Sequence, residues 1–188
     1  MDCADGLIEA AEATGNPMLL ALALGAYGMA FRDADPVGAL KALGRGLVIA
    51  QDSGNRTHAS VLASLLARLE AEHGDPVAAF DHVTLAIRNF HDAGDTTTIR
   101  VPLSILGVLF DRLGRYEPAA TIAGFAFSPM TAALPEFSAA ITHLCDVLGE
   151  ATYESLAHKG ETMTTTAMVT YAYDQIDQAR TELKAVSE

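Results

Sequence analysis

Residues 54–94 read GNRTHASVLASLLARLEAEHGDPVAAFDHVTLAIRNFHDAG, and this stretch decides the fold. One apolar helical pattern precedes the turn Gly74-Asp75-Pro76 and a second pattern follows it. Asp before Pro is a helix-start signal, because Asp accepts from free backbone N–H groups and Pro fits the first helical position. The stretch therefore predicts a helical hairpin that closes at Gly94.

The hairpin is repeated along the chain. Its inner turn at residues 74–76 is matched by residues 34–36 and by residues 114–116, at steps of 40 residues in both directions (34 to 74 and 74 to 114). A glycine closes each unit, where a helix end needs a left-handed residue: Gly15, Gly54 and Gly94. Asn16 and Asp95 follow two of these glycines as candidate helix caps. Markers in register at several places of the unit indicate a repeat architecture.

Small residues recur at fixed places in the unit. A large-small pair lies on each first helix: Tyr27-Gly28, Leu66-Ala67 and Leu106-Gly107. We expect their small members to face Ala39, Ala79 and Ala119, so that the paired helices can approach closely. Gly44 and Gly46 are expected to allow close packing in the same way, at a cost in helix propensity of about 1 kcal/mol each.

The motif Leu106-Gly107-x-x-Phe110-x-x-x-Gly114-Arg115-Tyr116-x-x-Ala119 resembles the tetratricopeptide repeat. The period of 40 is longer than the usual 34 of that repeat and is similar to the repeats of MalT-like bacterial regulators. Residues 148–169 also resemble the C-terminal end of that group, in which such a region accompanies an ATPase module and often a LuxR-type or cyclase domain. The resemblance implies an all-α right-handed α-α superhelix (a TPR-like solenoid) and a role in a transcriptional regulator.

The predicted organisation is about three hairpins followed by a C-terminal helical cap. Residues 1–126 hold the repeats, as a half repeat at 1–15 and units near 16–53, 54–93 and 94–126, and residues 127–188 form the cap. Helices are expected over the following ranges: 4–14, 17–32, 36–52, 56–72, 76–92, 96–112, 116–126, 135–149, 150–158 and 164–185. The last range carries an apolar stripe at helical spacing. The half repeat predicts an uncovered apolar face, and with it self-association through the N-terminal end.

The formal net charge of −12 argues against a protein that binds the phosphates of nucleic acid or an anionic membrane surface. No basic-then-apolar leader is present, and the longest apolar run, residues 18–31, is shorter than the roughly 20 residues that span a bilayer. Two cysteines, Cys3 and Cys145, make no disulfide framework. We therefore expect a cytoplasmic protein that does not contact membrane or nucleic acid.

The sequence offers no catalytic constellation, no cofactor motif and no metal-ligand set, and it predicts no enzyme. His143 and Cys145 lie two residues apart, on different faces of a helix, so they are not expected to share an ion. The acidic pairs are interpreted as solvated helix faces: Glu70 with Glu72, and Asp174 with Asp177.

Partner contacts are expected on the concave groove, because the resemblance implies that the first helices of the units line it. The register places there Arg32, Asp33, Ser64, Arg68, Glu72, Ser104, Asp111 and Arg112. Arginine can hold a carboxylate with two parallel hydrogen bonds, which favours Arg32, Arg68 and Arg112 as contacts. A protein or peptide partner is the first hypothesis and a small-molecule effector the second. The same residues are also compatible with solvated helix ends that pair at i,i+4, as Arg68 and Glu72 can.

Overall fold

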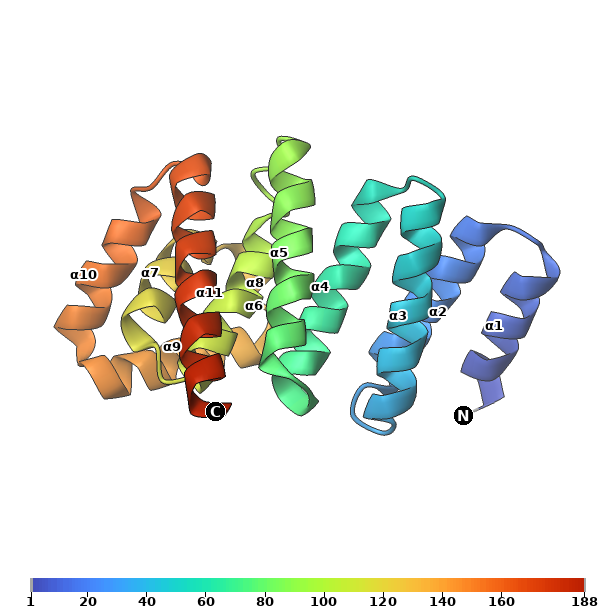
Figure 1. Cartoon of the computed structure of the whole chain (residues 1–188), viewed down its shortest axis with the longest axis horizontal. Helices are drawn as coiled ribbons and strands as arrows, with labels where there is room; N and C mark the ends of the chain where they lie inside the picture. The colour runs from blue at the N-terminus through green and yellow to red at the C-terminus, as the bar shows by residue number, and fades with distance from the viewer. Residues whose placement is uncertain (1, 188) are drawn as a thin grey trace. The chain divides into compact units, whose positions relative to one another are not determined.

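A computed structural model describes residues 2–187, and every regular element in that range is a helix (Figure 1). The all-α prediction is confirmed. The chain divides into two compact units, residues 1–89 and residues 90–188, and each is described by itself. No helix among the described residues combines the length and the apolar character needed to cross a bilayer.

Unit 1 consists of α1 (Asp2–Ala13), α2 (Pro17–Phe31), α3 (Pro36–Asp52), α4 (Arg56–His73) and most of α5 (Pro76–Asp92). Along the chain, α1 packs on α2, α2 on α3 and α3 on α4, and α2 also touches α4 (Figure 1). The predicted ranges for α2 to α5 agree with these bounds to within one residue. The repeated cap-and-proline signal therefore marks real helix starts.

The caps act as the sequence predicts. Asn16 Oδ1 accepts from the N–H of Met18 at 2.9 Å, and Asp35 and Asn55 accept in the same way at the starts of α3 and α4. Gly15 and Gly54 take left-handed conformations, with φ of 65° and 70°. Each helix thus begins and ends where its own residues satisfy the free backbone groups.

The core of unit 1 lies where α2, α3 and α4 meet. Leu62 of α4 is fully buried, and a Cβ built on Gly25 of α2 would lie 3.1 Å from its Cδ2 atom. Gly46 of α3 faces Leu24 and Leu62 at ordinary contact distance, as predicted, whereas Gly44 has no atom within 4 Å of such a Cβ, so its predicted packing role is wrong. The atoms nearest to a Cβ built on Gly28 belong to the side chain of Leu43.

Unit 2 contains α6 (Arg100–Arg112), α7 (Tyr116–Ala126), α8 (Pro129–Ala132), α9 (Pro135–Leu148), α10 (Glu150–Glu161) and α11 (Thr165–Ser187). α7 ends at Ala126, as predicted for that helix, and the division into repeats and cap at this point stays a prediction. The short helix α8 was not predicted; Ser128 and Thr131 cap it reciprocally.

The third hairpin differs from its predicted register in two places. α6 begins at Arg100 rather than at residue 96. Because Pro102 has no N–H to donate to Thr98, the carbonyl of Thr98 instead accepts from Val101 at 3.0 Å, and the first turn is tighter. At the inner turn, Gly114 has φ 72° whereas its counterpart Gly74 has φ −128°, so the two turns are not equivalent.

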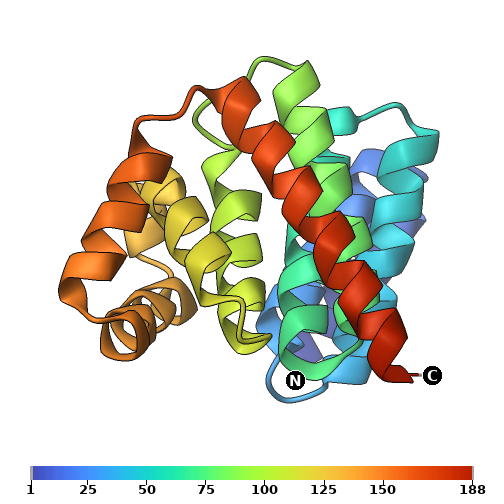
Figure 2. The same cartoon turned by 60° about the vertical axis from the view of Figure 1, so that its left-hand side comes forward.

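α7 and α10 cross with their backbones in direct contact (Figure 2). A Cβ on Gly160 would overlap the carbonyl oxygen of Thr121, and a Cβ on Gly124 would overlap that of Ala157. α10 ends at Glu161, which confirms the prediction that this helix ends near Gly160, although the predicted range of 150–158 is three residues short. Gly160 lies in the last turn of α10 and forms its packing contact with α7. Glycine here allows backbone-to-backbone approach.

α11 packs on α7 with the predicted apolar stripe. Met168, Ala172, Ile176 and Ala179 are buried, while Ala167 is exposed. Arg115, at the start of α7, donates to Gln175 Oε1 at 2.9 Å and pairs with Glu182 Oε2 at 2.7 Å. The polar network and the apolar stripe together hold α11 in place.

Candidate functional site

Unit 1 contains a small cavity framed by the first helices of two successive repeats. α2 contributes Arg32 and α4 contributes Arg68 and Glu72, three of the residues that the sequence places in a groove. The remaining lining is apolar or small: Gly28, Met29, Leu43, Leu65 and Leu69. Because Arg32 and Arg68 lie in different repeats, only the folding of unit 1 brings them together.

The cavity is narrow. The space open to the centre of a water molecule is about 20 Å³, which corresponds to roughly one water. Ligand pockets for drug-sized molecules are about 300–1,000 Å³. The cavity is therefore too small for a whole small molecule and accepts at most the tip of an apolar side chain, with the arginines at its mouth.

Acidic side chains lie near the arginines at the mouth of this cavity. Arg32 Nε lies 3.5 Å from Asp33 Oδ2, and His73 Nε2 lies 3.8 Å from Glu72 Oε2. Ligand atoms of Asp33, Glu72 and His73 come within 4.8 Å of one another. Asp33 and His73 are exposed, and such a cluster is not by itself a metal site. A guanidinium has five N–H donors, so an arginine that pairs inside the protein can still reach a second acceptor.

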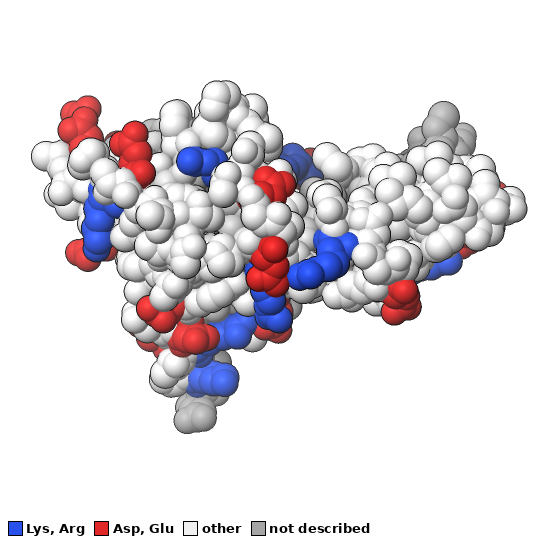
Figure 3. All heavy atoms as spheres, turned by 90° about the horizontal axis from the view of Figure 1, so that it is seen from above, with Lys and Arg blue, Asp and Glu red and all other residues white. Residues whose placement is uncertain are grey.

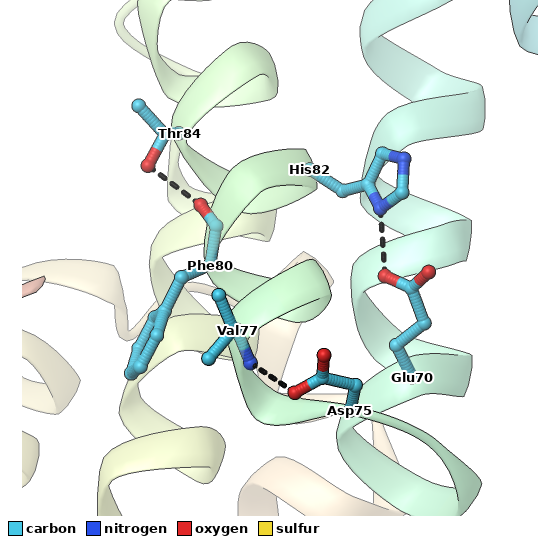
Figure 4. Close-up of polar contacts among 6 residues, drawn as sticks. All are labelled: Glu70, Asp75, Val77, Phe80, His82 and Thr84. Carbon is cyan, nitrogen blue, oxygen red and sulfur yellow. Dashed lines mark hydrogen bonds and ion pairs between the residues drawn. The ribbon is translucent and has the colours of Figure 1, made fainter. Parts of the chain in front are cut away.

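Glu70 does not belong to a solvated face. Only 13% of its side chain is exposed, and its Oε2 atom lies 2.6 Å from Nδ1 of His82 on α5 (Figure 4). The expectation for Glu70 is thus wrong, because the neighbouring helix covers it. Figure 4 also shows Asp75 accepting from the N–H of Val77, which caps α5. The Glu70–His82 pair links the two helices of one hairpin.

The other predicted groove residues take different places. Ser64 and Ser104 are buried, and their hydroxyls donate to carbonyls of their own helices, those of Ser60 and Val101. Asp111 is also buried and lies 2.8 Å from Nδ1 of His143 on α9. Arg112 is exposed. The Asp111–His143 pair spans 32 residues and two helices, so no local sequence pattern could have predicted it.

A second cavity lies within unit 2, where α10 faces α6 and the segment around Phe127. It is an open cleft of about 670 Å³. The polar residues that line it are Arg100, Ser128, Tyr153, Glu154, His158 and Glu161. Arg100 donates to the carbonyl oxygens of Phe125 and Phe127. Burial raises the pKa of Tyr153, so its phenol stays protonated and can donate at neutral pH.

The charges on the face drawn in Figure 3 are interspersed. Lysine and arginine form separate blue groups beside red acidic ones, and no broad basic area is seen on that face. A mixed surface of this kind fits local recognition by single arginines better than binding through a continuous charged stripe.

Comparison with known proteins gives no relative. No family model, no curated protein and no solved structure matches this chain. The tetratricopeptide-like and MalT-like assignments therefore stay predictions from the sequence motifs, and the candidate sites are interpreted from their geometry alone.

Proposed function

We propose that the chain is a non-catalytic, TPR-like interaction module, coiled as a right-handed superhelix, that binds a peptide segment of a partner protein at the Arg32–Arg68 cavity. The observation that carries the proposal is the meeting of both arginines over a small apolar cavity. The resemblance to MalT-like regulators supports a regulatory role for this binding in the cytoplasm.

The ligand chemistry follows from the lining. An apolar side chain of the peptide enters between Leu43, Leu65 and Leu69, and a carboxylate close to it, from Asp, Glu or a chain terminus, contacts Arg32 and Arg68. Arginine holds carboxylates with two hydrogen bonds, and buried apolar anchors surrounded by polar contacts dominate peptide affinity. An acidic, apolar motif is therefore the expected target.

The test is a selection from a library of random 12-residue displayed peptides on the full chain, followed by fluorescence anisotropy of the enriched peptides. Arg68→Glu should weaken binding at least about tenfold, since loss of a charge-assisted contact costs about 1.5–3 kcal/mol. Arg112→Glu is the matched control, because Arg112 is exposed and does not line the cavity. Enriched peptides without acidic residues, or equal losses in both variants, would contradict the proposal.

A small-molecule effector is the second candidate, and the cleft of unit 2 favours it by size. Its volume of about 670 Å³ falls in the range of small-molecule sites. A metabolite that raises the melting temperature saturably in wild type but not in Tyr153→Phe or Glu154→Ala would favour this function over peptide binding.

A further inference from the structure

The cleft of unit 2 has two chemically different sides. One side is apolar and is formed by Phe127, Pro129 and Ile141, and Phe127 exposes 58% of its surface. The other side is α10, which contributes the carboxylates of Glu154 and Glu161. These two residues are two helical turns apart, so they share a face of α10 and lie about 10 Å from each other along its axis. The cleft therefore combines an apolar surface with two separate negative charges.

Positive groups of the chain compensate these carboxylates only weakly. Arg100 is the one arginine or lysine among the described residues that line the cleft, and its guanidinium donates to the carbonyl oxygens of Phe125 and Phe127. His158 Nδ1 lies 3.5 Å from Glu161 Oε2, but the two side chains are 74% and 73% exposed, and water weakens such a pair. Both carboxylates of the cleft therefore remain accessible to a ligand.

The electrostatic surroundings favour a cation at this cleft. Burial raises the pKa of the nearby Cys145 thiol, and three carboxylates, that of Glu154 among them, raise it further. Since negative charge opposes the formation of a thiolate, this shift indicates a negative field where Glu154 lies. Burial also raises the pKa of Tyr153, so its phenol stays uncharged at neutral pH and adds no charge of its own.

We propose that the cleft of unit 2 binds a linear aliphatic polyamine, with one ammonium group at Glu154, another at Glu161 and the carbon chain against the apolar side. An ammonium group donates charge-assisted hydrogen bonds to a carboxylate, whereas an anionic ligand would be repelled by both glutamates and would find the donors of Arg100 occupied. The exposed ring of Phe127 attracts a cation as well. The proposal rests on the second candidate function, the small-molecule effector, and names its chemical class.

The separation of the two glutamates selects among cations. A monoamine reaches only one carboxylate at a time. A divalent metal ion binds its oxygen ligands at about 2–2.6 Å, so it cannot bridge two side chains that start about 10 Å apart on one helix. A flexible chain with an amine at each end reaches both carboxylates, and we therefore expect spermidine to bind more tightly than octylamine.

The test is isothermal titration calorimetry of spermidine into the full chain in about 0.15 M NaCl. Wild type should bind saturably, and Glu154→Gln and Glu161→Gln should each weaken binding about threefold to fivefold, the range expected for one exposed ion pair. Asp177→Asn is the matched control, because it removes the same charge from an exposed residue of α11 that does not line the cleft. Circular dichroism checks that all three variants stay folded.

The outcomes separate the ligand class from the site. Undetectable binding of spermidine, or equal losses in Asp177→Asn and the two glutamate variants, would overturn the proposal. A neutral or anionic metabolite whose thermal shift depends on Tyr153 would keep the second candidate function but overturn the polyamine as its ligand. If hexalysine bound more tightly than spermidine and lost affinity in Glu154→Gln, the occupant would be a lysine-rich peptide instead of a free polyamine.

Discussion

Asp95 shows how a single residue sets the start of the third hairpin. Its Oδ1 atom accepts from the N–H groups of Thr98 at 2.8 Å and Thr97 at 3.1 Å. The hydrogen bonds from Thr98, foremost the backbone one, lower the pKa of the Asp95 carboxyl below its ordinary value of 3.8. The charged form is thus more stable in the folded chain than in the unfolded one.

Asp95→Ala should lower the free energy of unfolding by about 1 kcal/mol at pH 7, because two N–H groups in the turn before α6 lose their acceptor. Because the folded pKa is depressed, the stabilisation is present above the unfolded pKa and is lost as pH falls through the folded pKa. Urea denaturation at pH 7 and at pH 2.5 measures both effects. Asp95→Asn keeps the acceptor without the charge and is the control. An Asp95→Ala loss of equal size at both pH values would contradict the assignment.

The Cys145 thiol is a residue without an assigned role. Burial raises its pKa, and the nearby acidic groups Glu150, Asp146 and Glu154 raise it further. A raised pKa leaves little thiolate at neutral pH, which is the reactive form. The expectation that Cys145 shares no ion with His143 stays a prediction from the sequence.

At the scale of elements, glycine has opposite roles in two helices. Gly160→Ala in α10 should destabilise the chain by about 1–3 kcal/mol, because the new Cβ meets the backbone of Thr121 and one helix must shift. Gly44→Ala in α3 is the matched control and should stabilise by up to about 1 kcal/mol, since its Cβ meets nothing and alanine favours helix. Thermal and urea melts of both variants measure the difference. Equal stability of the two variants would mean that α7 and α10 adjust freely.

Helix positions were predictable where local chemistry defines them. Asp35-Pro36 and Asp75-Pro76 carry their own start signals, and the glycine turns carry the ends, so the bounds of α2 to α5 follow from the sequence. The packing role of Gly160 is different, because a glycine at a helix end and a glycine at a helix crossing look alike in sequence. Only the packing of α10 on α7 distinguishes them.

The candidate site was predictable in part for a related reason. Arg32 and Arg68 lie towards the ends of the first helices of two successive repeats, so the sequence places them near each other, and both line the cavity. The pairs Glu70–His82 and Asp111–His143 depend on which faces of two helices meet. Tertiary packing determines which faces meet, and no spacing of residues along the chain predicts it.

For the molecule as a whole, the net charge of −12 is the dominant electrostatic feature. Like charges repel in the compact state, and added salt screens them. Exposed ion pairs such as Arg45–Glu12, at 2.7 Å, weaken in salt but contribute at most about 1 kcal/mol each. We therefore expect the repulsion to lower the free energy of unfolding by more than the exposed ion pairs raise it.

We expect the melting temperature at pH 7.5 to rise between 10 mM and 300 mM NaCl. The Debye length falls from about 30 Å to below 8 Å over this range, so most of the repulsion between separated charges is screened. At pH 4.7, close to the isoelectric point, the same salt series is the control and should have little effect. A melting temperature that falls with salt at pH 7.5 would show that specific ion pairs outweigh the net charge.

The turns that close the repeats also bear on how the length of such a protein can change. Gly54 and Gly94 have φ values of 70° and 69°, and the next residue donates in each case to the carbonyl five positions back, Asn55 to Ala50 and Asp95 to Phe90, both at 2.9 Å. If Gly54 were joined directly to the residue that follows Gly94, the backbone conformation at the junction would stay the same. Insertion or deletion of 40 residues can therefore add or remove a complete hairpin without a new linker, whether by gene duplication or by design.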